Sequence, residues 1–434
     1  MKRLLLCLGL MVPLTSSALT LEEALASAIT NDPALMGRYA RFNSLLEERG
    51  VITSEYYPQL SLNAGIGPED TKYSSGQLID EDLTRDEASL RIGWMLFNGF
   101  ETQANSKRLS FEAEAERQQL IADAENLALD VCGIYLQVRE AEQLVTLSQR
   151  HVADHQQIMD DVKRLVNTGF ANDGDVAQVS ARLANARSSL VSAQNNYQDV
   201  SAQFMRLVNL PPAALTDPVA DKVLLPSTMD EAVAWAKSSH PQLKAALSDI
   251  QAAKEEVRAS KSGYYPKIGI EGYANKGHDQ GGFEGPDEDY RVMVTMRYDL
   301  FNGGRDRSKA RASNWRYNEA LAIRVVAERD LEEGTLLSWN AHQSLTEQEQ
   351  FIRQSVDASS LAETAYTTQY KLGKRSLLDL LNAKVEVFSA RRNYLNTKYD
   401  QLQSSYRLLN ATGRLGYALR IAYPQEWANK EDEQ

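Results

Sequence analysis

Cysteine and long apolar runs are both scarce in this 434-residue chain. Of its two cysteines, Cys7 lies in an N-terminal segment that we expect to be removed, so the mature chain keeps only Cys132 and cannot form an intrachain disulfide. The N-terminal apolar run covers residues 4–14, which is shorter than the roughly 20 residues of a membrane-spanning helix. No other stretch comes close to that length, so a helical membrane anchor is not predicted.

The sequence also lacks the motifs of most enzymes. It contains no glycine-rich phosphate loop, no nucleophile elbow and no paired Cys and His. His151 and His155 have a spacing that can bind a metal ion on a helix, but no third ligand is evident. We therefore predict no enzymatic activity, no metal site and no cofactor.

An excess of basic residues is absent as well. The chain has 47 Lys and Arg against 59 Asp and Glu, a formal net charge of −12, and loss of Lys2 and Arg3 with the leader gives −12 − 2 = −14. This acidity argues against nucleic acid as a partner. The mean hydropathy of −0.43 suits a soluble protein, and equally a β-barrel whose strands alternate polar and apolar residues.

The N-terminus has the pattern of a secretory signal. Lys2 and Arg3 precede the apolar run at 4–14, and Ser16, Ser17 and Ala18 provide small residues for cleavage. We predict a signal peptide over residues 1–18 and export from the cytoplasm.

The remainder of the chain consists of two copies of one unit. The segment YYPQLSL at 56–62 recurs as YYPKIGI at 264–270, and LFNG at 96–99 recurs at 300–303. Similar matches lie nearer the start of each copy (NDPAL at 31–35, SHPQL at 239–243) and further along (Gly169 and Asp175, Gly373 and Asp379). We predict a first repeat at 19–210, a proline-rich linker at 211–228, a second repeat at 229–413 and a partly disordered acidic tail at 414–434.

Each copy is predicted to contain a helix, two strands, a very long helix and a further helix. In the first copy the helix spans residues 22–54 with a break at Asp32 and Pro33, and apolar residues then alternate over 60–66 and 90–96. In the second copy the alternation is clearest at 291–300. We expect polar loops to join the strands, over 67–87 and 277–289, as at the extracellular end of an outer-membrane barrel.

The long helices are expected at 100–165 and 305–371. The first stretch contains no proline and a single glycine, Gly133, so it would form a helix about 100 Å long. Its apolar residues follow a heptad seam, which indicates lengthwise packing against other helices. The seam residues are Leu127, Val131, Ile134, Val138, Ala141, Val145, Val152, Met159, Val162 and Val166, with Ser148 and His155 at two positions; in the second copy Leu345, Ile352 and Tyr366 form a looser seam.

Four strands per chain cannot close a barrel. An open sheet edge in lipid leaves backbone groups unpaired at several kcal/mol each, and known closed outer-membrane barrels have at least about eight strands. Several chains must therefore contribute to one barrel, and three chains would supply twelve strands.

The duplicated Tyr-Pro before a strand, the duplicated LFNG after one and the glycine followed six residues later by Asp resemble the TolC family of outer-membrane efflux and secretion channels. The resemblance covers the whole mature chain. It implies an α+β membrane protein: a homotrimer with a twelve-stranded β-barrel in outer-membrane lipid and a periplasmic coiled-coil barrel of helices. It also implies two partners, a periplasmic adaptor (membrane fusion) protein and an inner-membrane ABC transporter or other pump.

The resemblance further implies a gate at the periplasmic tips. By that likeness Asp379 lines the pore constriction, with Asn382 where relatives often have a second Asp. Tyr370 and Arg375 match the family's locking residues, with Asp175 and the backbone of Gly174 as their partners. The implied adaptor-docking positions are Gly169, Phe170, Leu372, Gly373 and Lys374. From the residues alone, Asp175 and Asp379 could also be ordinary helix-start residues and Arg375 a solvated charge.

The sequence leaves the exported cargo open. The expected function is the exit duct of a tripartite export system, with type I protein secretion favoured because the overall sequence resembles that branch of the family. The alternatives are the outer-membrane component of a multidrug efflux pump and, from another class, a periplasmic coiled-coil scaffold that never enters the membrane.

Overall fold

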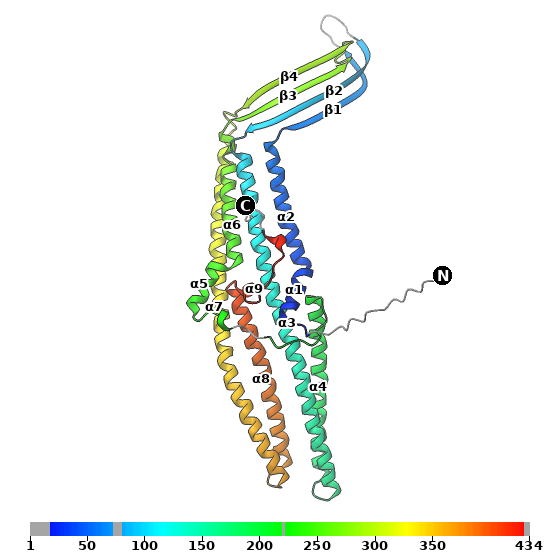
Figure 1. Ribbon diagram of the computed structural model, residues 1–434, viewed down its shortest axis with the longest axis vertical. Coiled ribbons are helices and arrows are strands. Elements are labelled where there is room, and N and C mark those ends of the chain that lie inside the picture. Colours follow the sequence, from blue (N-terminus) through cyan, green and yellow to red (C-terminus); the bar gives the residue numbers. More distant parts are fainter. Residues whose placement is uncertain (1–17, 73–79, 219–221, 429–434) are drawn as a thin grey trace, which may run out of the picture. The chain divides into compact units, whose positions relative to one another are not determined.

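The computed structural model describes residues 18–72, 80–218 and 222–428 (Figure 1). The predicted signal peptide, except for Ala18, lies outside the described residues, as do 73–79, 219–221 of the predicted linker, and 429–434 of the predicted tail. The chain divides into two compact units. The sheet unit contains Gly37–Leu120 and Gln242–Glu328, and the tip unit contains the described parts of Met1–Met36, Ile121–Pro241 and Arg329–Ala428.

The order of elements repeats in the two halves of the chain, as predicted. The first half contains α1 (Leu21–Asn31), α2 (Pro33–Thr53), β1 (Gln59–Lys72), β2 (Asp80–Phe97), α3 (Glu101–Asn167) and α4 (Asp173–Val208). The second half contains α5 (Met229–Ser239), α6 (Pro241–Ala259), β3 (Lys267–His278), β4 (Pro286–Arg297), α7 (Arg305–Lys371) and α8 (Leu377–Ala411). Short helices η1 (Ser54–Tyr56), η2 (Lys222–Leu224), η3 (Ser262–Tyr264), α9 (Leu415–Ala418) and η4 (Gln425–Trp427) complete the described chain.

The sequence explains where the helices begin and end. Thr20 caps α1 in a capping box with Glu23, and Thr228 caps α5 in the second half by accepting from the backbone N–H of Glu231. Each prolyl break falls after a first short helix, because Pro33 and Pro241 begin α2 and α6. The two long helices, α3 and α7, have 67 residues each and match the predicted spans within two residues.

The sheet unit contains one antiparallel sheet in the order β1-β2-β3-β4. The strands are longer than expected: β1 continues to Lys72 and β2 begins at Asp80, so most of the loop predicted over 67–87 is strand. Likewise β3 and β4 reach into the loop predicted over 277–289 and leave only 279–285 between them. The predictions were wrong because these extensions are mostly polar on both faces, so hydrophobic alternation does not mark them as strand.

The core of the tip unit lies along α3. Val131, Tyr135 and Val138 of the predicted seam region are almost completely buried, and Tyr406 of α8 and Phe204 of α4 are buried too. The Tyr135 hydroxyl donates to the carbonyl oxygen of Leu19 or Thr216, which lie 2.8 and 2.9 Å away. This bond joins the start of the described chain and the linker to the helix.

The C-terminal segment also packs in the tip unit. Leu415 is fully buried, and Trp427 is 7% exposed and stacks on Tyr423. The described residues of the predicted tail, 414–428, thus have packed positions, and the expected partial disorder of the tail stays a prediction.

None of the described helices has an apolar stretch long enough to cross a lipid bilayer.

Candidate channel wall and tip region

The sheet has one apolar face that the chain itself leaves uncovered. Leu62, Val292 and Val294 are 71–80% exposed. Cross-strand register places the apolar side chains in rows, of which one joins Leu60, Ile92, Gly272 and Val292 and the next Leu62, Leu90, Ala274 and Tyr290. An ordinary soluble hairpin would bury such a face against its helices, and this one does not.

The opposite face of the sheet is polar. Its rows contain Gln59, Ser61 and Asn63 of β1, and Arg91, Tyr273 and Arg291 of the following strands. The outer strands β1 and β4 each have one neighbour within the described sheet, so the sheet ends in two open edges. One apolar face, one polar face and two open edges are the features of a barrel segment that needs further strands.

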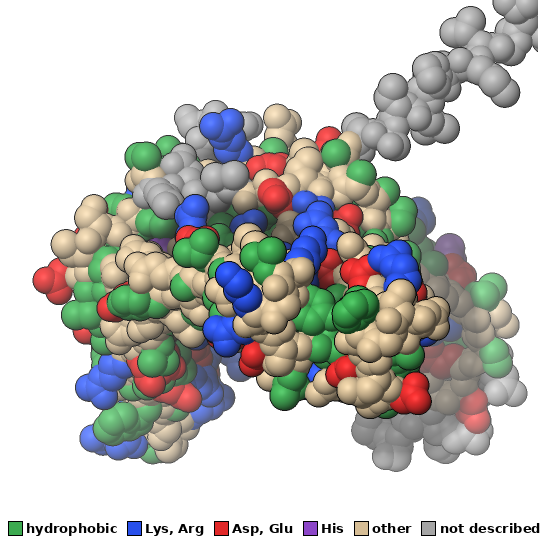
Figure 2. All heavy atoms as spheres, turned by 90° about the horizontal axis from the view of Figure 1, so that it is seen from below, with side chains coloured by type: hydrophobic (Ala, Val, Ile, Leu, Met, Phe, Trp, Pro, Cys, Tyr) green, Lys and Arg blue, Asp and Glu red, His purple; other side chains and the backbone are tan. Residues whose placement is uncertain are grey.

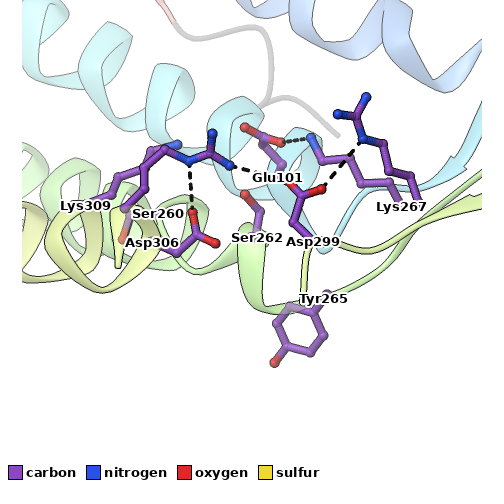
Figure 3. Close-up of a pocket in the computed structure, with 11 residues that line it drawn as sticks. Glu101, Ser260, Ser262, Tyr265, Lys267, Asp299, Asp306 and Lys309 are labelled. Carbon is purple, nitrogen blue, oxygen red and sulfur yellow. Dashed lines mark hydrogen bonds and ion pairs between the residues drawn. The ribbon is translucent and has the colours of Figure 1, made fainter. Parts of the chain in front are cut away.

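A polar pocket of about 340 Å³ lies in the sheet unit where the strands meet the helices (Figure 3). Lys267 binds Glu101 at 2.8 Å, and Arg305 lies 3.4 Å from Asp299 and 3.6 Å from Asp306. A Cβ atom at Gly263 would lie 2.6 Å from the Asp306 carboxylate, which would have to move aside. Ion pairs in this pocket thus connect the ends of the strands to the helices that follow them.

The two helical hairpins of the tip unit end in the same way (Figure 1). Gly169 and Gly373 adopt left-handed backbone conformations with φ of 81° and 72°. The N–H of Phe170 donates to the Leu165 carbonyl, and the N–H of Lys374 donates to the Gln369 carbonyl, both at 2.9 Å. These are Schellman motifs, so the predicted docking positions form two equivalent helix ends. Phe170 is 85% exposed and Leu372 is 65% exposed.

The residues after each tip begin the next helix. Asn172 caps α4 in a capping box with Asp175, and Ser376 caps α8 by accepting from the N–H of Asp379. Asp175 and Asp379 are thus the third residues of their helices, where a carboxylate is favoured by the helix dipole. This local role is present in the single chain.

A cleft of about 810 Å³ lies at the tips, and its lining includes Tyr370, Asp175 and Arg375. Burial, and then the nearby carboxylates of Asp175 and Asp161, raise the pKa of the Tyr370 phenol. Within the single chain Arg375 contacts its own hairpin: its Nε donates to Gln369 at 3.0 Å, its Nη1 lies 3.7 Å from Asp379, and its guanidinium stacks on Tyr366. The pairing of Arg375 with the Gly174 backbone stays a prediction.

The hairpins pack through an apolar core beside the cleft. Its buried members come from α3, α4 and α8 and are Ile158, Met159, Val162, Val179, Leu183, Leu377, Leu380 and Leu381. Tyr370 of α7 packs against this core. Asn382 accepts a hydrogen bond from Arg182 at 3.1 Å, which links α8 to α4. Seen from below, hydrophobic side chains and charges of both signs are mixed over the surface (Figure 2).

Two polar clusters lie above this core, and sequence reasoning missed the first of them. Lys384 of α8 binds Glu363 of α7 at 2.6 Å and Asp154 of α3 at 3.4 Å, which ties three helices together. A lysine and a glutamate on separate helices carry no sequence signal of pairing, because their contact depends on tertiary packing.

The second cluster contains the histidine pair. His151 stacks on Phe388, and the His151 and His155 rings lie 4.4 Å apart. Burial, and then the neighbouring His155, lower the pKa of His151 to about 4. In the described part of the chain no three His, Cys, Asp or Glu side chains are grouped as metal ligands.

Comparisons with known proteins give this geometry its context. The family described as "Outer membrane efflux protein" matches residues 24–210 and 233–414. The chain is 25% identical to the outer membrane efflux protein BepC of Brucella suis over 91% of this chain and 86% of that protein. It is 22% identical to the alkaline protease secretion protein AprF of Pseudomonas aeruginosa over 92% of this chain and 86% of AprF.

The fold is also that of solved channels. The crystal structure of the outer membrane protein VceC from Vibrio cholerae superposes with a TM-score of 0.77 at 17% identity, covering 91% of this chain and 96% of that one. The family match falls in two segments that correspond to the two halves of the chain. The four-stranded sheet and long helices are thus those of a TolC-like channel, with a transmembrane barrel and a periplasmic helical domain, and the protein is not an enzyme. This chain belongs to the outer membrane efflux protein family, the TolC-like channels of the outer membrane.

Proposed function

We propose that the chain forms a homotrimer whose twelve strands close one barrel and whose helices form the periplasmic part of an export duct. The sheet with two open edges and an uncovered apolar face carries this proposal. In sequence order the strands alternate in direction, so β4 of one copy can pair antiparallel with β1 of the next. Pairing at both edges removes every unpaired edge from the lipid.

Adjacent residues on opposite faces of β4 test the barrel. Val294→Arg would place a charge on the apolar face, at a cost of about 2–4 kcal/mol at the bilayer midplane, whereas Thr295→Arg would place it on the polar face. We expect only Val294→Arg to abolish recovery of a detergent-extracted, heat-modifiable trimer from the outer membrane. Equal recovery of both variants would overturn the proposal.

The cargo we favour is protein exported by a type I system, with a periplasmic adaptor and an inner-membrane ABC transporter as partners. The support is the similarity to AprF, whose name states protease secretion, while the similarity to BepC, an efflux protein, supports the second candidate, drug efflux. A deletion strain compared with the complemented strain decides between them. Loss of a secreted protein with unchanged drug and bile-salt susceptibility is expected, and a change in susceptibility alone would refute the secretion assignment.

Family membership removes support for the periplasmic scaffold alternative.

We further propose that the tips form the gate. Three copies of Asp379 would form an acidic ring, with Asn382 adding no charge. Tyr370 and Asp175 line one cleft, which suits a locking contact, whereas the Arg375 contact to the Gly174 backbone would require the guanidinium to leave Asp379. The exposed Schellman turns at Gly169-Phe170 and Leu372-Gly373-Lys374 would receive the adaptor.

The gate is tested by conductance in planar bilayers. Asp379→Asn should lower the preference for cations over anions, and Tyr370→Ala should raise the open probability by loosening the cleft. The matched control is Lys371→Ala, which removes a neighbouring lysine with no proposed locking role. An unchanged conductance in both test variants would refute the gate assignment.

A further inference from the structure

The polar face of the sheet carries a row of side chains that the export function does not by itself require. Arg91 of β2, Tyr273 of β3 and Arg291 of β4 are directly opposite one another in the strand register. The guanidinium of Arg91 lies 5.6 Å from the centre of the Tyr273 ring, and that of Arg291 lies 4.7 Å from it. We call these three residues the arginine row.

The tyrosine ring explains how two like charges are held on the two strands that flank β3. Its electron-rich face attracts each guanidinium, which offsets part of their mutual repulsion. A carboxylate partner would serve better if the row were only structural. Arg91 has none among the described residues, and Arg291 has only Asp289, at 3.7 Å.

The charges around the row divide the polar face into two zones. From the row to the helix-linked ends of the strands, this face carries Arg91, Arg291, Lys267 and Arg297 against the single carboxylate of Glu271. Toward the hairpin ends it carries Asp289, Asp287, Glu87 and Glu69 against Arg85. The arginine row stands at the boundary between the two zones, and the two cations nearest the helices, Lys267 and Arg297, are already paired with Glu101 and Asp299.

We propose that the arginine row is an anion-binding site inside the barrel, which takes carboxylate or phosphate groups of material passing through it. This rests on the proposed function, because the polar face becomes the lumen only when three chains close the barrel. Guanidinium groups bind planar oxyanions through paired hydrogen bonds, and rings of Arg line anion-selective pores. Three copies of the row at one height would form such a ring.

The site predicts a block of ion current by oligoanions. Purified trimer in a planar bilayer is exposed to hexaglutamate, or in a separate arm to inorganic tripolyphosphate, added on the barrel side so that the anion reaches the row without crossing the tips. We expect both to block the wild-type current, and the double variant Arg91→Gln/Arg291→Gln to require about tenfold more of either anion for the same block. Block by one probe alone assigns the site to that oxyanion.

Matched variants separate charge from folding. Lys276→Gln removes a cation from the opposite face of β3, the strand of Tyr273, where Lys276 pairs with Glu288 at 3.1 Å, and should leave the block unchanged. Arg91→Lys/Arg291→Lys keeps the charge and should retain most of the block by tripolyphosphate. Tyr273→Phe keeps the ring and should behave as wild type, whereas Tyr273→Leu should weaken the block.

The outcomes distinguish this inference from the proposed function. If no variant, including wild type, inserts as a conducting trimer, the proposed function fails. If wild type conducts but the double glutamine variant is blocked as strongly as wild type, or Lys276→Gln loses the block equally, the arginine row is not an anion site and the channel assignment stands.

Discussion

The two long helices α3 and α7 have the same length and the same place in the two halves of the chain, yet they are buried to different extents. In α3, Leu120, Val131 and Tyr135 are fully buried. In α7, all of whose residues are described, Ala310 is the one buried hydrophobic residue, and Trp315, Leu337 and Leu361 are 54–73% exposed. Within the chain, α3 is therefore largely buried, whereas α7 has an exposed apolar surface.

The comparison shows that duplication preserved the length of the helix and not its surroundings. The exposed apolar residues of α7 include Trp315, Val326, Leu337 and Phe351, and their spacings are close to whole helical turns, so they share one face. A face of this kind in a chain with two open sheet edges is expected to pack against a second copy. α3 is thus the buried one of the two long helices, and α7 is the expected interface with another copy.

The largest effect is expected on the buried side of the comparison. Tyr135→Ala removes a fully buried ring and its hydroxyl bond to Leu19 or Thr216, so we expect a loss of about 3–5 kcal/mol in the free energy of unfolding. Denaturant titration of the detergent-solubilised protein measures it. Tyr135→Phe is the control and should lose only about 1 kcal/mol. Equal losses in both variants would show that packing of the ring contributes little.

A second effect concerns pH at the histidine pair of α3. The pKa of His151 is about 4 in the folded chain and 6.5 in the unfolded chain, so between these values only the unfolded state binds the proton. The contribution of His151 to the free energy of unfolding is therefore fully present above pH 6.5. It falls by about 1–3 kcal/mol as the pH drops toward 4. The groups facing the pair from neighbouring helices are Lys384 and Arg182, which add positive charge, while Asp154 favours protonation.

The variant His151→Phe isolates the effect of His151 protonation on stability. It retains an aromatic ring beside Phe388 and removes the proton site. The slope of unfolding free energy against pH between 6.5 and 4 should become shallower than that of wild type. An unchanged slope would assign the acid sensitivity to other groups.

On the open side of the comparison, a polar substitution should spare the protomer and weaken the assembly. Leu337→Gln on α7 changes a side chain that is already 54% exposed, so we expect less than about 0.5 kcal/mol of change in protomer unfolding. The fraction of trimer, measured by native mass spectrometry at decreasing concentration, should fall. Leu136→Gln on α3, where the side chain is 2% exposed, should instead destabilise the fold itself.

The smallest effect is expected at the tips. Arg182→Ala removes the exposed hydrogen bond to Asn382, and we expect a loss of about 0.5 kcal/mol in unfolding free energy. Arg187→Ala, which removes a comparable exposed bond to Gln156, is the matched control. A loss above 2 kcal/mol for Arg182→Ala alone would mean that this link holds the two hairpins together.

The helices and the repeat could be predicted from local pattern, but the strand lengths could not. The long helices appear in the sequence because proline is absent and apolar residues recur along a seam, both of which are local properties. The extensions of β1 and β2 are mostly polar on each face, and their pairing depends on cross-strand contacts such as that of Arg85 with Glu69 at 3.2 Å. Those contacts join residues that no periodicity relates.

At the tips, the sequence predicted where the helices end but not which side chains contact one another. Gly169 and Gly373 were expected at the turns and adopt the left-handed conformation that glycine favours. The guanidinium of Arg375 could be assigned to a partner only by resemblance, and in the structure it contacts Gln369, Tyr366 and Asp379 of its own hairpin. The roles of Asp379 and Asn382 in a pore remain predictions, because a ring needs three copies.

By itself the sequence determined the duplicated order of elements, the lengths of the long helices and the alternation of the membrane strands, because these depend on residue spacing along one chain. Only the tertiary structure decided which long helix is buried, how far the strands extend and that Arg91, Tyr273 and Arg291 lie in one row. Those features arise from contacts between residues up to about two hundred positions apart, and such contacts leave no periodic trace in the sequence.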